Sequence, residues 1–128
     1  MKKLLALAAA IEAATGLALV INPPLLSYLL LGEGISGAGL ALSRVAGFAL
    51  VSLGLACWPG FDSAGANTPA LRALFTYNLL ATLYFVYLGI GGGLVGSLLW
   101  PAVMIHAVLT ILLARAWPAA VGVEPVKQ

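Results

Sequence analysis

The sequence predicts an all-α membrane protein: a four-transmembrane-helix antiparallel bundle that forms a single domain over residues 1–128. Three observations lead to this prediction. Hydrophobic residues make up 62% of the chain and charged residues 8%, whereas a soluble domain has about 45–50% apolar and about 25% charged residues. Four apolar stretches are each long enough to cross the roughly 30 Å of hydrocarbon in a bilayer. Almost all Lys and Arg residues fall at one side of these stretches.

Proline residues mark the ends of the stretches. The first stops before Pro23, the third begins at Pro69 and the fourth stops before Pro118, since proline lacks the backbone N–H that a continuing helix needs. Lipid offers the backbone no hydrogen-bond partners, so each stretch is expected to be a helix. We expect the first stretch to remain as a span rather than be cleaved as a signal peptide, because its apolar run continues past Glu12 to Ile21. The predicted spans cover residues 4–21, 36–57, 69–88 and 94–117.

The basic residues predict the orientation of the bundle. They lie before the first span, at the second connection and near the C-terminus: Lys2, Lys3, Arg72, Arg115 and Lys127. The first and third connections contain no Lys or Arg. The positive-inside rule therefore predicts that both termini are cytoplasmic, N-in and C-in.

The two connections predicted on the outer side differ in character. Residues 23–31 are apolar but too few to span a bilayer. We expect them to form a short interfacial or re-entrant segment between spans one and two, with a plain lipid-embedded loop as the alternative. Residues 89–93 are glycine-rich, and so short a connection favours a tight hairpin between spans three and four.

Small residues on the second span predict a close helix contact. Gly39, Ser43 and Gly47 follow one another at intervals of four residues, and Gly54 lies one heptad after Gly47. Helices in lipid pack through such small residues. We expect this stripe to pack inside the bundle, against span one or span four, with a homodimer face as the alternative. Within the fourth span, Pro101 predicts a bend.

Each predicted span carries one strongly polar side chain: Glu12, Arg44, Asn78 and His106. With a rise of about 1.5 Å per residue, Glu12 and Arg44 lie roughly 13 Å and roughly 12 Å below the outer ends of their spans. A charge at this depth is costly, so we expect these two side chains to pair. The pair is either a structural ion bridge that sets the register of two helices or a proton or ligand site. In the second case Glu12 is the titrating group and Arg44 anchors an anion.

Other polar and aromatic residues belong to the same candidate site. Asn78 is expected to hydrogen-bond across helices. His106 is the one His in the chain, and it is either a hydrogen-bonded core residue or part of the site. Tyr77 and Tyr84 are seven residues apart and so share a helix face. There they either line a slot for a quinone or a lipid, or they pack in the core.

The sequence contains no sign of catalysis, metal binding or nucleic-acid binding. It has no nucleophile–base motif and no nucleotide loop, and its single His and single Cys form no metal-ligand pattern. We expect Cys57 to be a packing residue. The net charge of +2 is too small for a nucleic-acid footprint. The expected partner is the lipid bilayer, with a membrane-protein partner or a second copy of the chain as alternatives, and the sequence identifies no catalytic residue, metal or cofactor.

With these features the chain resembles the small bacterial four-helix membrane proteins grouped around the DoxX-like families. The resemblance rests on the four spans, the charged residue in span one, the run Arg44-Val45-Ala46-Gly47 and the Pro23-Pro24 outer loop. It implies a multi-pass protein of the bacterial inner membrane. Some members of this group are implicated as membrane subunits of quinone-linked oxidoreductases, so the resemblance allows a quinone-linked role and carries over no catalytic residue.

Three hypotheses for function remain, in the order in which the sequence favours them. The first is a non-catalytic membrane subunit or scaffold whose polar residues lock the bundle. The second is a proton-coupled transporter of small hydrophobic or cationic compounds that uses Glu12. The third is a quinone- or lipid-binding subunit of a membrane oxidoreductase, with the ligand between Glu12 and the face of Tyr77 and Tyr84.

Overall fold

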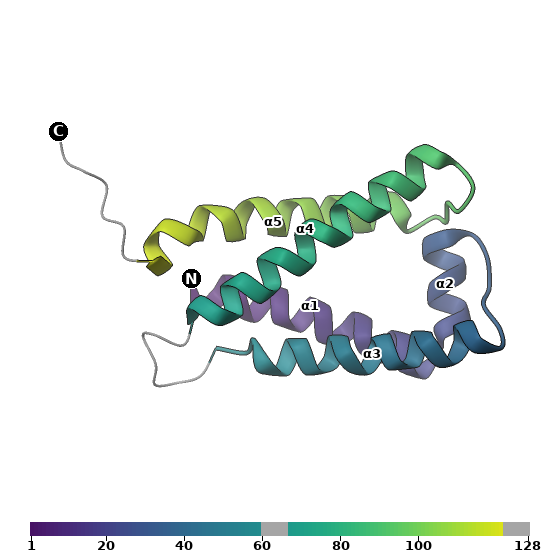
Figure 1. Ribbon diagram of the computed structural model, residues 1–128, viewed down its shortest axis with the longest axis horizontal. Helices are drawn as coiled ribbons and strands as arrows, with labels where there is room; N and C mark the ends of the chain where they lie inside the picture. Colours follow the sequence, from purple (N-terminus) through teal and green to yellow (C-terminus); the bar gives the residue numbers. More distant parts are fainter. Residues whose placement is uncertain (60–66, 122–128) are drawn as a thin grey trace.

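The computed structural model of the protein describes residues 1–59 and 67–121, and every regular element in these ranges is an α-helix (Figure 1). The helices are α1 (Lys2–Ile21), α2 (Pro23–Leu31), α3 (Ala38–Ala56), α4 (Asn67–Gly91) and α5 (Leu99–Val121). All but α2 are long and apolar enough to cross a membrane. The predicted all-α class with four such helices is therefore confirmed, and it indicates a multi-pass membrane protein. Lys127, used above to predict orientation, lies outside the described residues.

The short segment between the first two long helices is the helix α2. Asn22 caps its start, because the Asn22 side chain accepts a hydrogen bond from the Leu25 N–H at 3.2 Å and proline occupies the first helical position. Gly32 ends it in the left-handed conformation, with φ of 78°. In Figure 1, α2 lies across the end of the molecule opposite the N-terminus.

The start of the fourth long helix was predicted wrongly. The helix begins at Leu99 rather than at residue 94, and the apolar residues before it are irregular. Their backbone donors bond to the end of α2 instead: the Gly96 N–H donates to the Leu30 carbonyl at 2.9 Å, and the Leu98 N–H donates to the Leu29 carbonyl at 2.7 Å. These two hydrogen bonds tie α2 to the segment that leads into α5.

The reason for predicting a bend at Pro101 no longer applies, because α5 starts only at Leu99. Pro101 is the third residue of α5, and the first N–H groups of a helix have no partner within the helix in any case. Proline is tolerated at such positions. At the other end, α5 continues past Pro118 to Val121, although Pro118 was predicted to stop it. A proline removes its own N–H bond but leaves the remaining backbone groups of the turn able to bond.

The four long helices form two closely packed pairs. α1 packs along α3 and α4 along α5, whereas contacts between the two pairs are few. In Figure 1 the pairs lie nearest each other beside the N-terminus and separate toward α2. The space between the pairs at the α2 end is where the site described below is found.

Opposed glycines hold α1 against α3. A Cβ atom placed on Gly47 would lie 2.6 Å from the Gly16 carbonyl oxygen, and one placed on Gly16 would lie 2.6 Å from the Gly47 carbonyl oxygen. Gly54 meets the Ala9 carbonyl equally closely. The prediction that the small-residue stripe packs inside the bundle holds for Gly47 and Gly54, and the partner is span one. Gly39 and Ser43 are only half-buried.

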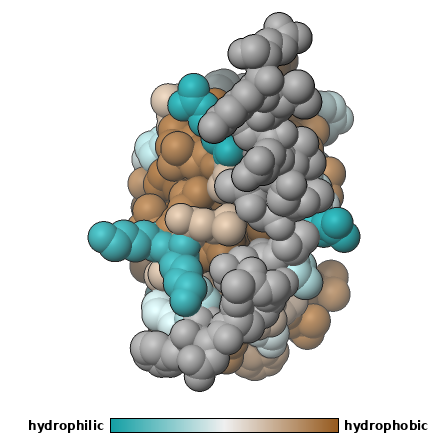
Figure 2. Space-filling view, turned by 90° about the vertical axis from the view of Figure 1, so that its left-hand side faces the viewer, coloured by the Kyte–Doolittle hydropathy of each residue, from teal (hydrophilic) through white to brown (hydrophobic). Residues whose placement is uncertain are grey.

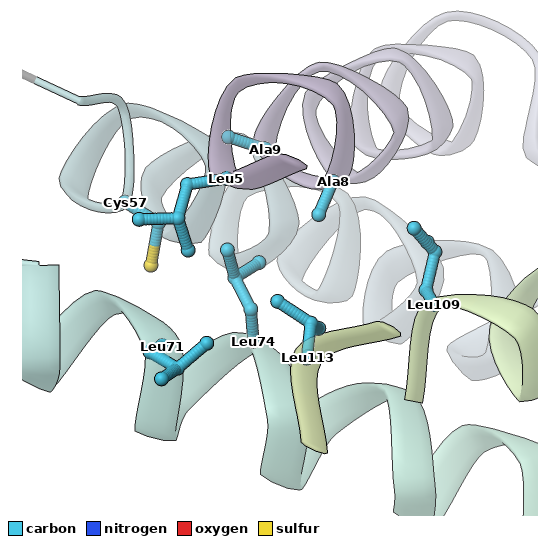
Figure 3. Close-up of a cluster of buried hydrophobic side chains, with 8 residues drawn as sticks. All are labelled: Leu5, Ala8, Ala9, Cys57, Leu71, Leu74, Leu109 and Leu113. Carbon is cyan, nitrogen blue, oxygen red and sulfur yellow. The ribbon is translucent and has the colours of Figure 1, made fainter. Parts of the chain in front are cut away.

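A hydrophobic core joins the two pairs near the N-terminus. Its fully buried members come from all four long helices or their ends, and Figure 3 shows them facing one another: Leu5, Ala8, Ala9, Cys57, Leu71, Leu74, Leu109 and Leu113. Cys57 packs in this core, as predicted. Seen from this end, the molecule has a largely hydrophobic surface from which a few hydrophilic side chains project (Figure 2). Burial of the eight core side chains holds the two helix pairs together at this end of the molecule.

A Gly96→Ala substitution is expected to release α2 from the segment before α5. A Cβ atom on residue 96 would overlap the Leu29 carbonyl, so the backbones must separate and lose their two hydrogen bonds. We expect the Leu98 amide to exchange with solvent deuterium about ten-fold faster, which is the loss of one ordinary hydrogen bond. Gly93→Ala is the matched control, because nothing lies within 4 Å of a Cβ there. Equal exchange in both variants would contradict the contact.

Candidate functional site

Glu12 is completely buried between the two helix pairs. The buried residues of α1 recur every three or four positions, and this places Glu12 on the same strip as Leu5 and Ala8. The Glu12 side chain has no exposed surface. A buried carboxyl group needs a hydrogen-bond partner, and among the described residues that partner comes from α4.

Asn78 of α4 joins Glu12 of α1 to His106 of α5. Its Nδ2 group donates to Glu12 Oε1 at 3.1 Å and to the Leu74 carbonyl at 2.9 Å. Its Oδ1 atom lies 2.7 Å from His106 Nδ1. The three side chains form one continuous cluster, hereafter the Glu12–Asn78–His106 cluster, that links three of the four long helices. The cluster was not predicted as a unit, although all three residues were candidate site residues.

The hydrogen bond to Leu74 determines where the protons lie. A carbonyl can only accept, so the amide nitrogen of Asn78 must face Leu74 and its oxygen must face His106. An amide oxygen can only accept as well, and His106 therefore donates from Nδ1. This assignment leaves the other ring nitrogen, Nε2, free for a further interaction.

Two atoms of the cluster lack a hydrogen-bond partner among the described residues. Glu12 Oε2 is buried and unpartnered. None of the hydrogen bonds within the described chain reaches His106 Nε2. Glu12 and His106 do not touch directly, since Glu12 Oε1 lies 4.0 Å from His106 Nδ1. The cluster thus retains hydrogen-bonding capacity that residues 1–59 and 67–121 do not use.

Two aromatic rings of α4 hold the imidazole. The Tyr77 ring meets it edge-on, with centroids 5.9 Å apart, and the Phe85 ring lies at 5.7 Å. Such edge-to-face arrangements are the favoured aromatic contacts. Tyr77 is thus in the site as predicted, whereas Phe85 was missed. Phe85 lies seven residues after Asn78 and so shares its face of α4, and this spacing is the signal that identifies it.

A cavity of about 240 Å³ adjoins the cluster on the α2 side. Its walls come from all five helices and from the segment before α5, and they are almost entirely apolar. His106, Tyr77 and Thr15 are the polar side chains that line it. Thr15 already donates to the Ile11 carbonyl at 2.9 Å. The imidazole is therefore the group of the cluster that a molecule in the cavity meets.

The predicted pairing of Glu12 with Arg44 is wrong. Arg44 is exposed on α3, and the partners of Glu12 are Asn78 and His106. The reason is the rotation of α3 about its axis. α3 turns its buried strip of Gly47, Leu50 and Gly54 toward its neighbours. Arg44 comes directly after Ser43 and so lies about 100° further round the helix, at the edge of this strip.

Tyr84 also lies outside the site. Its side chain is 60% exposed and stacks on Tyr87, with ring centroids 6.3 Å apart. The shared face of Tyr77 and Tyr84 points partly outward, because Asn78 and Phe85 occupy the inward face of α4. Within residues 1–59 and 67–121, no group of three or more His, Cys, Asp and Glu side chains is placed to hold a metal ion.

Comparisons of the chain with protein-family models, with curated proteins and with solved structures gave no match. The resemblance to the DoxX-like families stays a prediction. The functional argument therefore rests on the cluster and the cavity beside it.

Proposed function

We propose that this chain is a multi-pass membrane protein that binds a small lipophilic molecule between its two helix pairs, with His106 as the polar anchor. The observation that carries the proposal is the position of His106. Its Nδ1 is engaged by the buried cluster, while the side chain also lines the apolar cavity. Apolar cavities with one or a few well-placed polar groups are the usual form of small-molecule sites.

The dimensions of the cavity suit a ring compound with a short tail. A cavity of about 150 Å³ is large enough to hold benzene, and this one measures about 240 Å³. The walls supply the rings of Tyr77 and Phe85 together with branched aliphatic side chains. A quinone ring or the end of a lipid chain belongs to this class of ligand.

The proposal includes an orientation in the membrane. The four long helices cross the bilayer in alternating directions, and both termini lie in the cytoplasm of a bacterial-type cell. The basic residues support this arrangement: Lys2 and Lys3 are exposed at the start of α1, and Arg72 and Arg115 lie near the start of α4 and the end of α5. The hydrophobic core then closes the cytoplasmic half, and the cavity lies in the outer half beside α2.

A purely structural role is the second candidate, because the Glu12–Asn78–His106 cluster links α1, α4 and α5. Contacts between the two helix pairs are few. In a membrane subunit or scaffold the cluster would set how the pairs dock, and the cavity would serve no ligand. Filling the cavity without touching the cluster separates the two candidates.

Photolabelling in native membranes tests ligand binding. A small lipophilic diazirine is expected to label Tyr77, Phe85 and His106 in the wild-type protein. Ala102 lines the cavity one helical turn before His106, toward the α2 end of α5, so Ala102→Phe is expected to fill the cavity and abolish labelling of these residues. Ala114→Phe, on the exposed face of the same helix, is the matched control and is expected to label like the wild type. Unchanged labelling in Ala102→Phe, or labelling confined to lipid-facing residues, would overturn the proposed site.

A further inference from the structure

His106 is the member of the Glu12–Asn78–His106 cluster that lines the cavity, beside the polar side chains of Tyr77 and Thr15. Of the two unpartnered atoms in the cluster, Glu12 Oε2 belongs to a side chain without exposed surface, whereas the His106 side chain retains 9% of its surface. His106 also lines the cavity, and Glu12 does not. A molecule in the cavity therefore meets the imidazole and not the buried Glu12 carboxyl group.

The hydrogen bonds of the cluster determine what Nε2 offers. Because Nδ1 carries the proton that is donated to Asn78 Oδ1, the Nε2 atom of a neutral imidazole is an acceptor. If His106 were charged and hydrogen-bonded to Glu12, His106 Nδ1 and Glu12 Oε1 would lie about 2.7–2.9 Å apart. They remain 4.0 Å apart with the neutral Asn78 between them. This spacing fits a neutral imidazole, and its Nε2 lone pair is then the acceptor that a molecule in the cavity can use.

We propose that the ligand is a lipophilic phenol-type compound whose hydroxyl group donates to His106 Nε2; this rests on the ligand binding proposed above. The hydroxyl group matches the lone pair, and the aromatic ring matches the Tyr77 and Phe85 walls. An ether, or a ketone such as an oxidised quinone, only accepts hydrogen bonds. A ligand of either kind would leave Nε2 without a hydrogen-bond donor and facing a second acceptor, which costs binding free energy in a site shielded from water. The ligand class named above therefore narrows to rings that carry a hydroxyl group.

Matched probes test the inference in lipid nanodiscs. Para-hexylphenol and its methyl ether, para-hexylanisole, each compete with diazirine labelling of Tyr77, and their membrane concentrations are measured. The phenol is expected to compete at a concentration on the order of ten-fold lower, which is the value of one buried hydrogen bond. In His106→Asn the amide nitrogen can replace Nδ1 and nothing replaces Nε2, so the two probes are expected to compete equally.

The single His of the chain allows a second measurement that needs no variant. In protein labelled with ¹⁵N-histidine every imidazole signal belongs to His106. Solid-state NMR is expected to find the neutral tautomer protonated at Nδ1, and the Nε2 signal is expected to shift when the phenol is added and not when the ether is added. A tautomer protonated at Nε2, or an imidazolium, would overturn the inference.

The outcomes of these experiments separate the two proposals. Equal competition by phenol and ether in the wild type would overturn the phenol assignment, while the competition itself would still support a binding site. A preference for the phenol that persists in His106→Asn would also overturn the assignment, because another group would then recognise the hydroxyl. Absence of cavity labelling in the wild type would overturn the proposed function itself.

Discussion

Gly47→Ala is expected to destabilise the protein by about 2–3 kcal/mol, the upper part of the range for overpacked sites. A Cβ atom at this position lies 2.6 Å from the Gly16 carbonyl oxygen. This neighbour is backbone, so no change of rotamer can relieve the overlap, and α1 and α3 must move apart. Helix contacts in lipid depend on such close approach. Reversible unfolding in mixed detergent micelles measures the loss.

Gly39→Ala is the matched control for this prediction. It makes the same substitution on the same helix, where the nearest atoms to a Cβ, on Ile35, lie at ordinary contact distances of 3.7 and 3.9 Å. Alanine is the better helix former by roughly 0.5–1 kcal/mol. We expect Gly39→Ala to be as stable as the wild type or slightly more stable. Equal stability of Gly47→Ala and Gly39→Ala would refute the opposed-glycine contact.

Asn78→Leu is expected to cost on the order of 3 kcal/mol of stability, since it leaves two buried groups unsatisfied at about 1–3 kcal/mol each. Leucine is similar in size but cannot donate to Glu12 Oε1 or accept from His106 Nδ1. The carboxyl group of Glu12 would then have no hydrogen bond from the described residues. Unfolding in the same micelles measures the change.

Two further variants make the Asn78 prediction specific. Thr82→Val removes a hydroxyl group that bonds to the carbonyl of Asn78 within its own helix at 2.7 Å, and a change within about 0.5 kcal/mol is expected. Glu12→Leu combined with Asn78→Leu removes both partners of one contact, so the double variant is expected to be more stable than Asn78→Leu alone by about 1 kcal/mol or more. Strictly additive losses would rule out the coupling of Glu12 and Asn78.

Depth along the helices predicts correctly that Glu12 and Asn78 lie at a similar height, but it predicts the wrong partner, Arg44, for Glu12. A rise of about 1.5 Å per residue places Glu12, Arg44 and Asn78 roughly 13, roughly 12 and roughly 15 Å below the outer ends of their predicted spans, so height alone does not choose between Arg44 and Asn78 as the partner of Glu12. Height contains no information on rotation about the helix axis. In the structure α1 turns Ala9 and Gly16 toward α3 and turns Glu12 toward α4 and α5. The partner of Glu12 depends on that division of faces.

The predicted start of α5 was wrong for a related reason. Residues 94–98 are apolar and read as part of a span, since hydropathy reports only where a segment prefers to be. Their backbone donors bond to the Leu29 and Leu30 carbonyls of α2, residues far away in the sequence. No local sequence pattern indicates these hydrogen bonds to α2, although Gly96 is the residue that allows the two backbones to approach each other.

By itself the sequence determined the number of long apolar helices and most of their approximate bounds, because these follow from local composition and proline chemistry. It marked residues 23–31 as a short apolar segment but left open whether they form a helix or a loop. Only the tertiary structure decided that α1 pairs with α3 through Gly16 and Gly47, that Asn78 bridges Glu12 and His106, and that a cavity lies beside the imidazole. These features depend on how each helix is rotated and on which backbones approach most closely. Both are set by contacts between residues far apart in the chain.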